Sequence, residues 1–416
     1  MRVLVLNCGS SSLKFQLIES LAPSVSGGRE NRLARGLIDR IGDQAICTFT
    51  GTGHSPSSES TPIRNHEEAV QKVLSWLKPE KGSGFEEIDA VGHRVVHGGD
   101  RFTGSVLIDD EVDAIIEALN DLAPLHNPAC LSGIRAARAV LSSAVPMVAV
   151  FDTAFHHTIP DYASTYAIPY ELSSRHRVRR YGFHGLAHNY LALRYAEIKA
   201  IPTDQVNIVT LHLGNGCSAA AIRRGKSVDT SMGFTPLEGL VMGTRSGDLD
   251  PAVVGYLALK EGISVIEVEG MLNKQSGLLG ISGRSNDMRE LIERAKEDGR
   301  ARLAIEIFCY RARKYLGAYF AALGSAEAVV FSGGIGENSP LVRAKICEGM
   351  EWCGLRLDSH RNEALVGVEG QISTNAARIH AYVIPTDEEL VIARETVSVV
   401  EKGSGKEGTQ SGSTKV

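Results

Sequence analysis

The sequence predicts an α/β protein with two domains. Apolar, strand-like runs alternate with helical segments along most of the chain, which is the pattern of α/β folds. The 416 residues are enough for two domains with substantial cores. A strand, a Gly-centred polar turn and a returning strand also occur twice, around Gly9 and around Gly214. The two sequences match only weakly, but they suggest one supersecondary unit used twice.

The first half of the chain opens with a predicted hairpin. Residues 3–6 form an apolar strand and residues 7–12 a polar turn; in the returning strand Leu13, Phe15 and Leu17 alternate with polar residues. Further strands are expected at 37–41, 45–50, 90–96 and 147–151, helices at 66–77, from Asp109 to about 122 and after Pro128, and loops at 23–31, 51–61 and 78–84.

The second half repeats this alternation after an irregular stretch, residues 153–183, which we expect to hold a hinge. Strands are expected at 207–213, 217–222, 328–331 and 379–384, and helices at 251–260, 264–273, 287–297 and 302–323, with another starting near 339–340. The glycines of SGGIGEN, residues 332–338, predict a turn. A last helix should end near residue 400, and the polar tail, 402–416, is predicted to be disordered.

Composition excludes several classes of protein. The net charge of −5 argues against a nucleic-acid-binding protein, which needs a basic face. Seven scattered cysteines without a C-x-x-C pair predict reduced, mostly buried thiols in a cytoplasmic protein, and neither disulfides nor a zinc site. No apolar run approaches the roughly 20 residues that span a bilayer, so no membrane segment is expected.

Two nucleotide-binding signatures almost fit but are rejected. Gly225-Lys226-Ser227 resembles the end of a P-loop, yet Ala220 stands where the first glycine is required. Residues 214–219 match G-x-G-x-x-A after a strand, but a Rossmann turn must open a helix, and the sequence AAAIRR continues as a strand. Neither motif predicts a nucleotide site here.

Three separate polar turns predict a phosphate site instead. Residues 7–12, 212–216 and 333–338 each follow an apolar strand, and ligands of α/β folds collect at the carboxyl ends of strands. The first turn offers backbone N–H groups, serine hydroxyls and Lys14. Taken alone it could equally be an ordinary serine-rich hairpin. Three such turns at equivalent places favour phosphate binding.

Charged residues near these turns complete a candidate site. Arg94, His184 and Arg245 lie among glycines, where a cationic side chain with little apolar surface to cover is typical of an anion clamp. Asp152 ends a strand and Glu388 precedes the last helix. With Asn7 they are candidate Mg²⁺ ligands, since Mg²⁺ on nucleotide phosphates takes only one or two protein oxygens. Glu388 could instead complement the helix dipole, and both interpretations remain open.

The motifs together resemble the acetate kinase (acetokinase) family over residues 1 to about 400. The resemblance rests on VLVLNCGSSSLKFQL, GHRVVHGG, LAPLHNP, VFDTAFH, YGFHG, HLGNG, MGTRSGDLDP, FSGGIGEN and PTDEE, in the family's order. It implies a member of the acetate and sugar kinase, chaperone ATPase and actin superfamily. The implied fold is two-domain, with a duplicated ribonuclease H-like βββαβαβα core and a cleft between the domains. The N-terminal domain would comprise 1–152, completed by a helix at about 386–401, and the nucleotide-binding domain 153–385.

The resemblance also implies roles for individual residues. Asp152, His184 and Arg245 would be catalytic, and Asn7 and Glu388 would bind Mg²⁺, for which Mn²⁺ can substitute. The acetate site would be Arg94 with the apolar residues Val96, Leu125, Phe183 and Pro236. The contacts to ATP or ADP would be Ser12, Lys14, His212, Leu213, Gly214, Asn215, Gly216, Asp287, Met288, Arg289, Gly334, Ile335, Gly336, Glu337 and Asn338.

The implied reaction converts ATP and acetate to ADP and acetyl phosphate, reversibly. A carboxylic acid is already ionised at pH 7, so the acceptor needs no general base. We therefore expect Asp152, assigned to proton transfer in the family, to orient Arg94 or a metal-bound water instead. Domain closure about the 150s and the 385 region should exclude water. Alternatives are a propionate or other short-chain acyl kinase and, more remotely, a non-catalytic nucleotide switch of the actin or chaperone type. The family is typically homodimeric.

Overall fold

A computed structural model of the chain describes residues 1–9, 11–19, 30–52, 54–77, 88–124 and 126–407. The expected loop at 78–84 and most of that at 23–31 lie outside the described residues. The chain divides into two compact units: unit 1 is Met1–Ala154 with Asp387–Val416, and unit 2 is Phe155–Thr386. The boundaries expected from the sequence, after residue 152 and near residue 386, fall within two residues of this division.

Unit 1 is built on an eight-stranded sheet in the order β5-β4-β3-β2-β1-β6-β8-β7. Its strands are β1 (Arg2–Cys8), β2 (Ser12–Glu19), β3 (Asn31–Asp39), β4 (Gln44–Gly51), β5 (His54–Pro62), β6 (Ala90–Val95), β7 (Val106–Leu107) and β8 (Met147–Phe151). β1 pairs antiparallel with β2 and parallel with β6, and β6 pairs parallel with β8. The predicted opening hairpin is therefore confirmed, with Asn7 paired to Lys14 at its turn.

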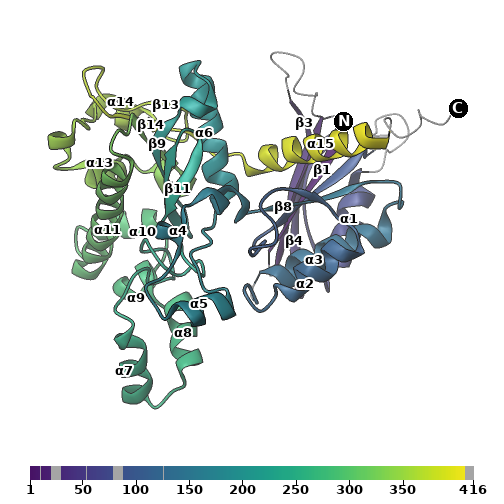
Figure 1. Ribbon diagram of the computed structural model, residues 1–416, viewed down its shortest axis with the longest axis horizontal. Helices are drawn as coiled ribbons and strands as arrows, with labels where there is room; N and C mark the ends of the chain where they lie inside the picture. Colours follow the sequence, from purple (N-terminus) through teal and green to yellow (C-terminus); the bar gives the residue numbers. More distant parts are fainter. Residues whose placement is uncertain (10, 20–29, 53, 78–87, 125, 408–416) are drawn as a thin grey trace, which may run out of the picture. The chain divides into compact units, whose positions relative to one another are not determined.

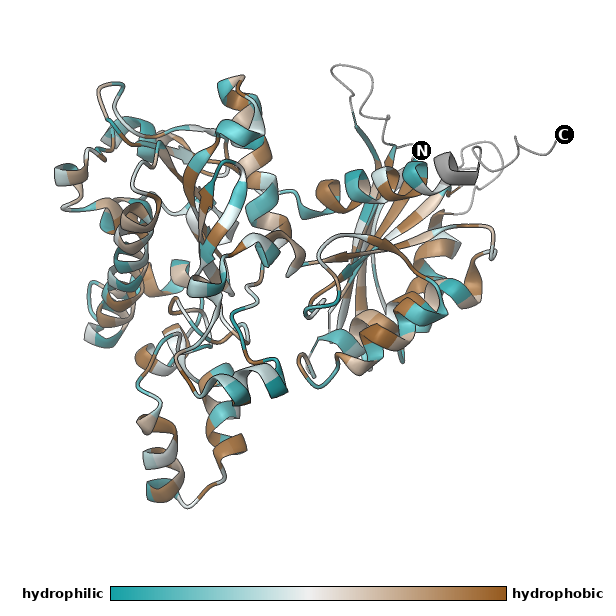
Figure 2. Cartoon of the chain, viewed as in Figure 1, coloured by the Kyte–Doolittle hydropathy of each residue, from teal (hydrophilic) through white to brown (hydrophobic). Residues whose placement is uncertain are grey.

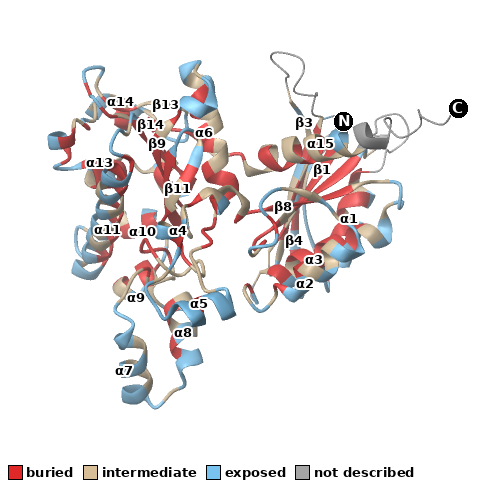
Figure 3. Ribbon diagram, viewed as in Figure 1, coloured by how far each residue is buried: buried red, intermediate tan, exposed pale blue. Residues whose placement is uncertain are grey.

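Helices cover both faces of this sheet (Figure 1). On one face lie α1 (His66–Leu77), α2 (Asp110–Ala118) and α3 (Asn127–Val140), and the other carries α15 (Glu388–Glu407). The predicted alternation in β2 is confirmed, because Leu13, Phe15 and Leu17 enter the core shared with α1 and α3. The strands β1 and β8 are mostly apolar and buried (Figures 2 and 3).

Close approach of α15 to the sheet depends on Gly92 in β6. A Cβ at this position would lie 2.4 Å from the Thr396 hydroxyl and 2.7 Å from Ile392, both on α15. The helix also runs further than the sequence predicted. It ends at Glu407 rather than near residue 400, so the predicted start of a disordered tail at residue 402 is wrong. The glycines there did end the apolar pattern, but they do not end the helix; residues 408–416 lie outside the described part of the chain.

Unit 2 contains a six-stranded sheet in the order β11-β10-β9-β12-β14-β13. Its strands are β9 (Asn207–Leu213), β10 (Cys217–Arg223), β11 (Lys226–Thr230), β12 (Ala328–Ser332), β13 (Gly370–Gln371) and β14 (His380–Val383). The β10 strand confirms that residues 214–219 do not open a helix, so the Rossmann motif was correctly rejected. β9 pairs antiparallel with β10 and parallel with β12.

Two long helices flank this sheet. α6 (Gly185–Lys199) shares one apolar core with β9, β10, β12 and β14, and α11 (Gly299–Leu323) lies on the opposite side of the sheet (Figure 1). The remaining α-helices of the unit are α4 (Asp161–Ser164), α5 (Tyr170–His176), α7 (Ala252–Glu261), α8 (Val265–Lys274), α9 (Gly277–Ser282), α10 (Met288–Arg294), α12 (Gly333–Asn338), α13 (Pro340–Cys347) and α14 (Ser359–Ala364). Short 3₁₀ helices span Ala154–Thr158, Thr203–Gln205 and Glu351–Cys353.

The two sheets share one topology. The order β3-β2-β1-β6-β8 in unit 1 corresponds to β11-β10-β9-β12-β14 in unit 2, with antiparallel pairing on one side of the first strand and parallel pairing on the other. The hairpin turns around Gly9 and Gly214 occupy equivalent places in these sheets. The predicted duplication of a ribonuclease H-like core is confirmed.

Three further sequence-based predictions of secondary structure were wrong. The polar segment 51–61 largely forms the edge strand β5, whose backbone pairs with β4 from Gln44 to Gly51. The expected SGGIGEN turn is a short helix, α12, that begins directly after β12. The stretch 153–183 is not wholly irregular, because it contains α4 and α5. Helix α6 had no predicted counterpart at all.

All seven cysteines are buried and none forms a disulfide, as predicted. Among the described residues, no helix combines the length and the apolar composition needed to cross a bilayer.

Candidate active site

The predicted site residues of unit 1 meet at the carboxyl ends of β1, β6 and β8, next to the start of α15. Side chains alternate between the faces of a strand. Gly92 faces α15, so Arg94, two residues further along β6, emerges on the same face. Asp152 follows the last residue of β8, the parallel neighbour of β6, and its backbone N–H donates to the Val95 carbonyl. The topology therefore brings Arg94 and Asp152 together.

Arg94 and Asp152 form a bidentate ion pair. The Arg94 Nε donates to Asp152 Oδ1 at 3.1 Å, and Nη2 donates to Oδ2 at 2.5 Å. The Nη1 of Arg94 donates to Asn7 Oδ1 at 3.2 Å. A guanidinium has five N–H donors, so these contacts among the described residues leave two. The Asp152 side chain is only 1% exposed, whereas that of Arg94 is 21% exposed. Asp152 and Asn7 thus hold the Arg94 guanidinium in place, while part of it stays accessible to solvent.

The charged side chains of Glu388 and Lys14 act on this pair as well. Burial tends to lower the pKa of Arg94, but the carboxylates of Asp152 and Glu388 raise it above its ordinary value, so Arg94 is always a cation. Burial raises the pKa of Glu388; Arg94 opposes this effect, and the negative charge of Asp152 adds to it. Lys14 lies on the face of β2 that is opposite to Leu13 and Phe15, and its positive charge also opposes the rise in the pKa of Glu388. Arg94 and Lys14 thus oppose the rise in the pKa of Glu388 that burial and Asp152 cause.

The donor set at this end of unit 1 fits a hard divalent cation. Glu388 offers a carboxylate and Asn7 an amide oxygen, which is the ligand type that Mg²⁺ prefers. Asn7 Oδ1 accepts one hydrogen bond from Arg94 and retains a second lone pair. Within the described ranges, no group of three or more His, Cys, Asp or Glu side chains could hold a metal by itself. A metal here would depend on oxygens from water and from a bound phosphate.

In unit 2, His184 and Arg245 converge on Gly216. A Cβ at Gly216 would lie 3.3 Å from His184 Nε2 and 3.7 Å from Arg245 Nη1. His184 stands immediately before α6 in a left-handed backbone conformation, with φ of 55°. The Nη1 of Arg245 donates to the Pro236 carbonyl at 3.1 Å. Burial lowers the pKa of Arg245, and among the described residues no carboxylate pairs with it. Its positive charge is therefore available to an anion.

A partly buried ion pair secures the long loop that carries Arg245 and Pro236. This loop connects β11 with α7. Arg180 Nη2 donates to Glu238 Oε1 at 2.6 Å, and its Nη1 donates to the Thr230 carbonyl at 3.0 Å. The hydroxyl of Tyr166 also donates to Glu238. Because Arg180 lies four residues before His184, this pair ties the segments that bear His184 and Arg245 to each other.

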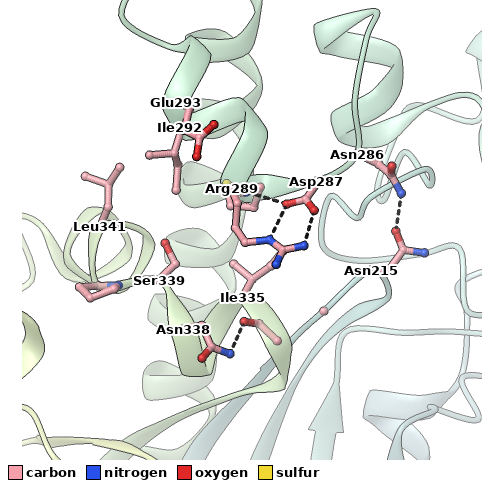
Figure 4. A pocket seen from close by; sticks show the side chains of 14 residues that line it. Asn215, Asn286, Asp287, Arg289, Ile292, Glu293, Ile335, Asn338, Ser339 and Leu341 are labelled. Atoms are coloured by element: carbon pink, nitrogen blue, oxygen red, sulfur yellow. Dashed lines mark hydrogen bonds and ion pairs between the residues drawn. The ribbon is translucent and has the colours of Figure 1, made fainter. Parts of the chain in front are cut away.

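A cavity of about 770 Å³ opens beside the β9–β10 turn (Figure 4). Its walls combine apolar side chains with amides and hydroxyls, a combination typical of small-molecule sites. Eight of the predicted nucleotide contacts line it: Gly214, Asn215, Asp287, Met288, Arg289, Gly334, Ile335 and Asn338. Six lining residues were not predicted: Asn286, Ile292, Glu293, Ser339, Pro340 and Leu341.

Asp287 and Arg289 hold each other in place in the wall of this cavity. Asp287 caps α10, accepting from the Arg289 backbone N–H at 2.8 Å, and the Arg289 guanidinium donates to both of its carboxylate oxygens (Figure 4). Hydrogen bonds from the guanidinium and the backbone of Arg289 lower the pKa of Asp287 to about 2. Asn286 Nδ2 similarly donates to Asn215 Oδ1 at 3.0 Å, which joins two walls of the cavity.

The other predicted nucleotide contacts are not in this cavity wall. Glu337 has a structural use, since its Oε1 accepts from the backbone N–H groups of Gly333 at 2.9 Å and Thr386 at 3.2 Å. Those bonds occupy the carboxylate that was expected to approach the nucleotide. The remaining predicted contacts outside the wall are Ser12 and Lys14 in unit 1 and His212, Leu213, Gly216 and Gly336 in unit 2.

Comparisons with known proteins identify the family. The sequence profile of the acetokinase family matches residues 2–394. The chain belongs to the acetokinase family. An acetate kinase of Solibacter usitatus is 55% identical to this chain over 407 residues, which cover 96% of this chain and 98% of the relative.

Solved structures of the family have the same fold. The acetate kinase of Porphyromonas gingivalis superposes with a TM-score of 0.88 at 44% identity, covering 96% of this chain and 99% of that one. A propionate kinase of Francisella tularensis gives a TM-score of 0.87 at 43% identity, with the same coverage. The resemblance drawn from the motifs and the two-domain acetokinase fold are both confirmed.

The apolar acyl pocket expected for an acetokinase stays a prediction. Val96 directly follows β6 and is buried, and Leu125 lies outside the described residues. Phe183 and Pro236 belong to unit 2, where Phe183 is buried and its carbonyl accepts from His156 Nε2 at 3.0 Å. The roles assigned to Asp152, His184, Arg245 and the metal ligands likewise stay predictions.

Sequence reasoning missed the residues that support these side chains. Ser218 and His188 stand behind His184, and Arg180 with Glu238 secures the Arg245 loop. The sequence did carry one signal, because Arg180 and His188 flank the recognised motif YGFHG. Nothing local marks Ser218 or Glu238, whose partners come from distant parts of the chain.

Proposed function

We propose that this chain transfers the γ-phosphoryl group of ATP to acetate, reversibly, giving acetyl phosphate and ADP. The observation that carries this proposal, in a chain of the acetokinase family, is that the Arg94 guanidinium is held in place and keeps two N–H donors for a ligand. Asp152 and Asn7 hold the guanidinium at the end of β6 and leave two N–H donors. A planar guanidinium binds a carboxylate through two parallel hydrogen bonds. Arg94 is thus suited to hold the carboxylate of the acceptor.

The chemistry needs little from a general base, because the acceptor is already an anion at neutral pH. The obstacle is charge: a carboxylate must approach a highly anionic nucleotide in line with the bond that breaks. Positioning and neutralisation of the equatorial oxygens then supply most of the rate. Arg245 and His184 both approach Gly216. Arg245 would stabilise the transferring group by its positive charge and His184 by an N–H donor.

The nucleotide would bind in the 770 Å³ cavity of unit 2. The base and ribose would lie among Met288, Ile335 and the amide side chains there. The β- and γ-phosphates would lie near the turn at Gly214–Gly216, which leads directly to His184 and Arg245.

Mg²⁺ would be held by Asn7 and Glu388, with water and phosphate oxygens completing its coordination. When bound, it would neutralise phosphate charge. Asp152 would act by orienting Arg94 rather than by transferring a proton, in keeping with their bidentate pair. The seven buried, unpaired thiols support a cytoplasmic location, where thiols stay reduced.

The function is tested by trapping the acyl phosphate with hydroxylamine. Purified protein is incubated with ATP, Mg²⁺ and acetate, propionate or butyrate, and the hydroxamate is measured. We expect acetate to react best, with kcat/KM about 10-fold or more above that for propionate, because one methylene changes discrimination by roughly 1–3 kcal/mol. ATP without a carboxylate is the control for hydrolysis. Absence of hydroxamate with all three acids would refute the proposal and favour a nucleotide switch.

A propionate kinase is the second candidate. The solved propionate kinase of Francisella tularensis is as similar to this chain as the acetate kinase of Porphyromonas gingivalis, at 43% and 44% identity. The same assay separates the two functions, since a higher kcat/KM with propionate than with acetate would select this alternative.

We further propose that two copies of the chain form a homodimer through α7 and α8. No residue of α7 is buried, even though the helix carries large apolar side chains: Leu259 is 82% exposed and Tyr256 61%. On α8, Ile266 is 79% exposed. Figures 2 and 3 show apolar residues along α7 and no buried ones, whereas α8 also buries Val268 and Leu272. Exposed apolar surface of this kind marks an interaction site.

The dimer is tested by sedimentation of a variant that combines Leu259→Asp with Ile266→Asp. The natural protein should sediment at twice the 44.7 kDa of one chain and the variant at the mass of one. Trp352→Asp, which charges another exposed apolar residue of unit 2, should leave the dimer intact. A double variant that remains dimeric would place the interface elsewhere.

A further inference from the structure

A row of buried polar side chains stands behind His184 in unit 2. His184 Nδ1 lies 2.9 Å from the hydroxyl of Ser218 on β10, and the same hydroxyl lies 2.8 Å from Nε2 of His188 on α6. His188 Nδ1 in turn lies 2.7 Å from the hydroxyl of Thr210 on β9. Ser218, His188 and Thr210 are all fully buried. The row therefore links His184 to the core of the sheet.

The direction of each hydrogen bond in this row depends on the next. The Ser218 hydroxyl has one proton and cannot donate to both histidines. In one arrangement the Ser218 hydroxyl donates to His188 Nε2, and His188 then donates from Nδ1 to Thr210. Ser218 accepts a hydrogen bond from His184 Nδ1 in this case. In a second, Thr210 donates to His188 Nδ1, His188 donates from Nε2 to Ser218, and Ser218 donates to His184 Nδ1. A third, in which both histidines donate to Ser218, leaves the buried Ser218 proton without an acceptor among the described residues, so two arrangements remain.

The hydroxyl of Thr210 decides between them. In the first arrangement its proton must go elsewhere, and the acceptor in the structure is the Ala220 carbonyl at 3.5 Å. That distance is at the limit of a hydrogen bond. In the second arrangement the proton lies in the 2.7 Å contact with His188 Nδ1. Since a buried hydroxyl donor is costly to leave unpaired, the second arrangement is favoured.

Burial and neighbouring positive groups favour neutral rings in this row. Burial, and next the neighbouring His156 and His212, lower the pKa of His188 well below its ordinary value. The Arg245 guanidinium approaches the same Gly216 position as His184 Nε2, and a like charge opposes an imidazolium there. The His212 ring, 5.0 Å from that of His184 between centroids, is a further imidazole beside it.

We propose that Thr210, His188 and Ser218 form a relay that holds a neutral His184 in the tautomer with its proton on Nε2. His184 then presents an N–H donor on the side of Gly216 and Arg245 without carrying a charge. If the chain transfers phosphoryl groups as proposed above, this donor would stabilise the transferring group, and the three residues would be positioning residues for it. The tautomer itself does not depend on that function.

The tautomer is measured by NMR on protein labelled with ¹⁵N-histidine, in which bare and protonated ring nitrogens have distinct shifts. The His184 signals are assigned by their loss in His184→Asn. We expect a bare Nδ1 and a protonated Nε2. His156 is an internal reference, because its Nε2 must donate to the Phe183 carbonyl, at 3.0 Å. A protonated Nδ1 on His184 would overturn the proposal, whether or not the protein makes an acyl phosphate.

Variants test the role of the relay. Thr210→Val removes the hydroxyl that sets the direction and should mix the two His184 tautomers, whereas Thr210→Ser keeps it and should preserve the natural spectrum. Ser218→Ala should mix them as well. Ser227→Ala is the matched control, because Ser227 is equally buried and its hydroxyl lies 2.8 Å from His156 Nδ1. It should leave His184 unchanged.

Kinetics should follow the spectra. Ser218→Ala and Thr210→Val should lower kcat about 10-fold, the scale of one lost hydrogen bond, with KM for ATP and for acetate nearly constant. Thr210→Ser should restore the rate. Natural kcat in Thr210→Val, or an equal loss in Thr210→Ser, would contradict a positioning role. Should Ser218→Ala fail to fold, the two Thr210 variants and the natural spectrum still decide the question.

Discussion

Replacing Arg245 by alanine should lower kcat about 10²–10³-fold, the usual effect of losing one charged donor to a transition state. Its guanidinium is half-buried, has no carboxylate partner among the described residues, and reaches the position beside Gly216 that His184 also approaches. A cation kept without a counter-ion is costly unless an anion occupies the site during turnover. The KM for acetate should change little, because Arg94 holds the acceptor. Steady-state kinetics with acetate and ATP measure both constants.

The control for this variant is Arg223→Ala. Arg223 is the last residue of β10, at the opposite end of the strand from Gly216, and its guanidinium donates to the Ala322 carbonyl at 2.6 Å. The Arg223→Ala variant removes an arginine from the same unit and should leave kcat unchanged. Arg245→Lys keeps a positive charge and should lose less rate than Arg245→Ala. Near-normal turnover in Arg245→Ala would remove this residue from the mechanism.

The strands and the duplicated topology could be predicted because their signals are local and strong. Apolar runs such as residues 3–6, 147–151 and 328–331 form interior strands of the two sheets and are buried. The two Gly-centred hairpins then fixed which strands correspond. Helix α1 was found from an apolar stripe that the structure buries without exception.

The errors come from elements whose formation depends on distant partners. β5 is rich in serine, which has little preference for strands, and forms because β4 offers its edge. α12 contains three glycines, which disfavour a helix. Glu337 compensates by accepting from Gly333 N–H, and Arg343 donates to the Gly336 and Glu337 carbonyls. None of these contacts can be read from a local pattern.

Helix α6 illustrates the same limit at the site. Its apolar stripe is interrupted by His188, a buried polar residue in a core position, so the helical period is weak in the sequence. His188, which interrupts the stripe, is the residue that connects Thr210 to Ser218. Motifs located the charged residues of the site, whereas the neutral side chains that orient them could be found only after the fold had brought β9, β10 and α6 together.

Asp152→Asn should lower kcat/KM for acetate about 100-fold, the scale of lost charge-assisted hydrogen bonds. The amide keeps the shape of the side chain but offers only one oxygen, so the bidentate pair with Arg94 cannot form. Arg94 would then be less well oriented toward the acceptor. The Mg²⁺ dependence should change too, because Asp152 contributes to the negative potential at Glu388. Initial rates at varied acetate and Mg²⁺ give both effects.

The pH profile distinguishes orientation from proton transfer. If Asp152 only holds Arg94, the variant should be slower by the same factor across neutral and alkaline pH, since the carboxylate acceptor needs no base. Recovery of the rate only at high pH would mean that Asp152 removes a proton, and the positioning role would be wrong. Asp113→Asn is the matched control: its carboxylate accepts from Arg135 Nη2 at 2.7 Å, in the same unit but away from the site. That variant should react at the natural rate, and thermal unfolding of both shows whether any loss reflects stability.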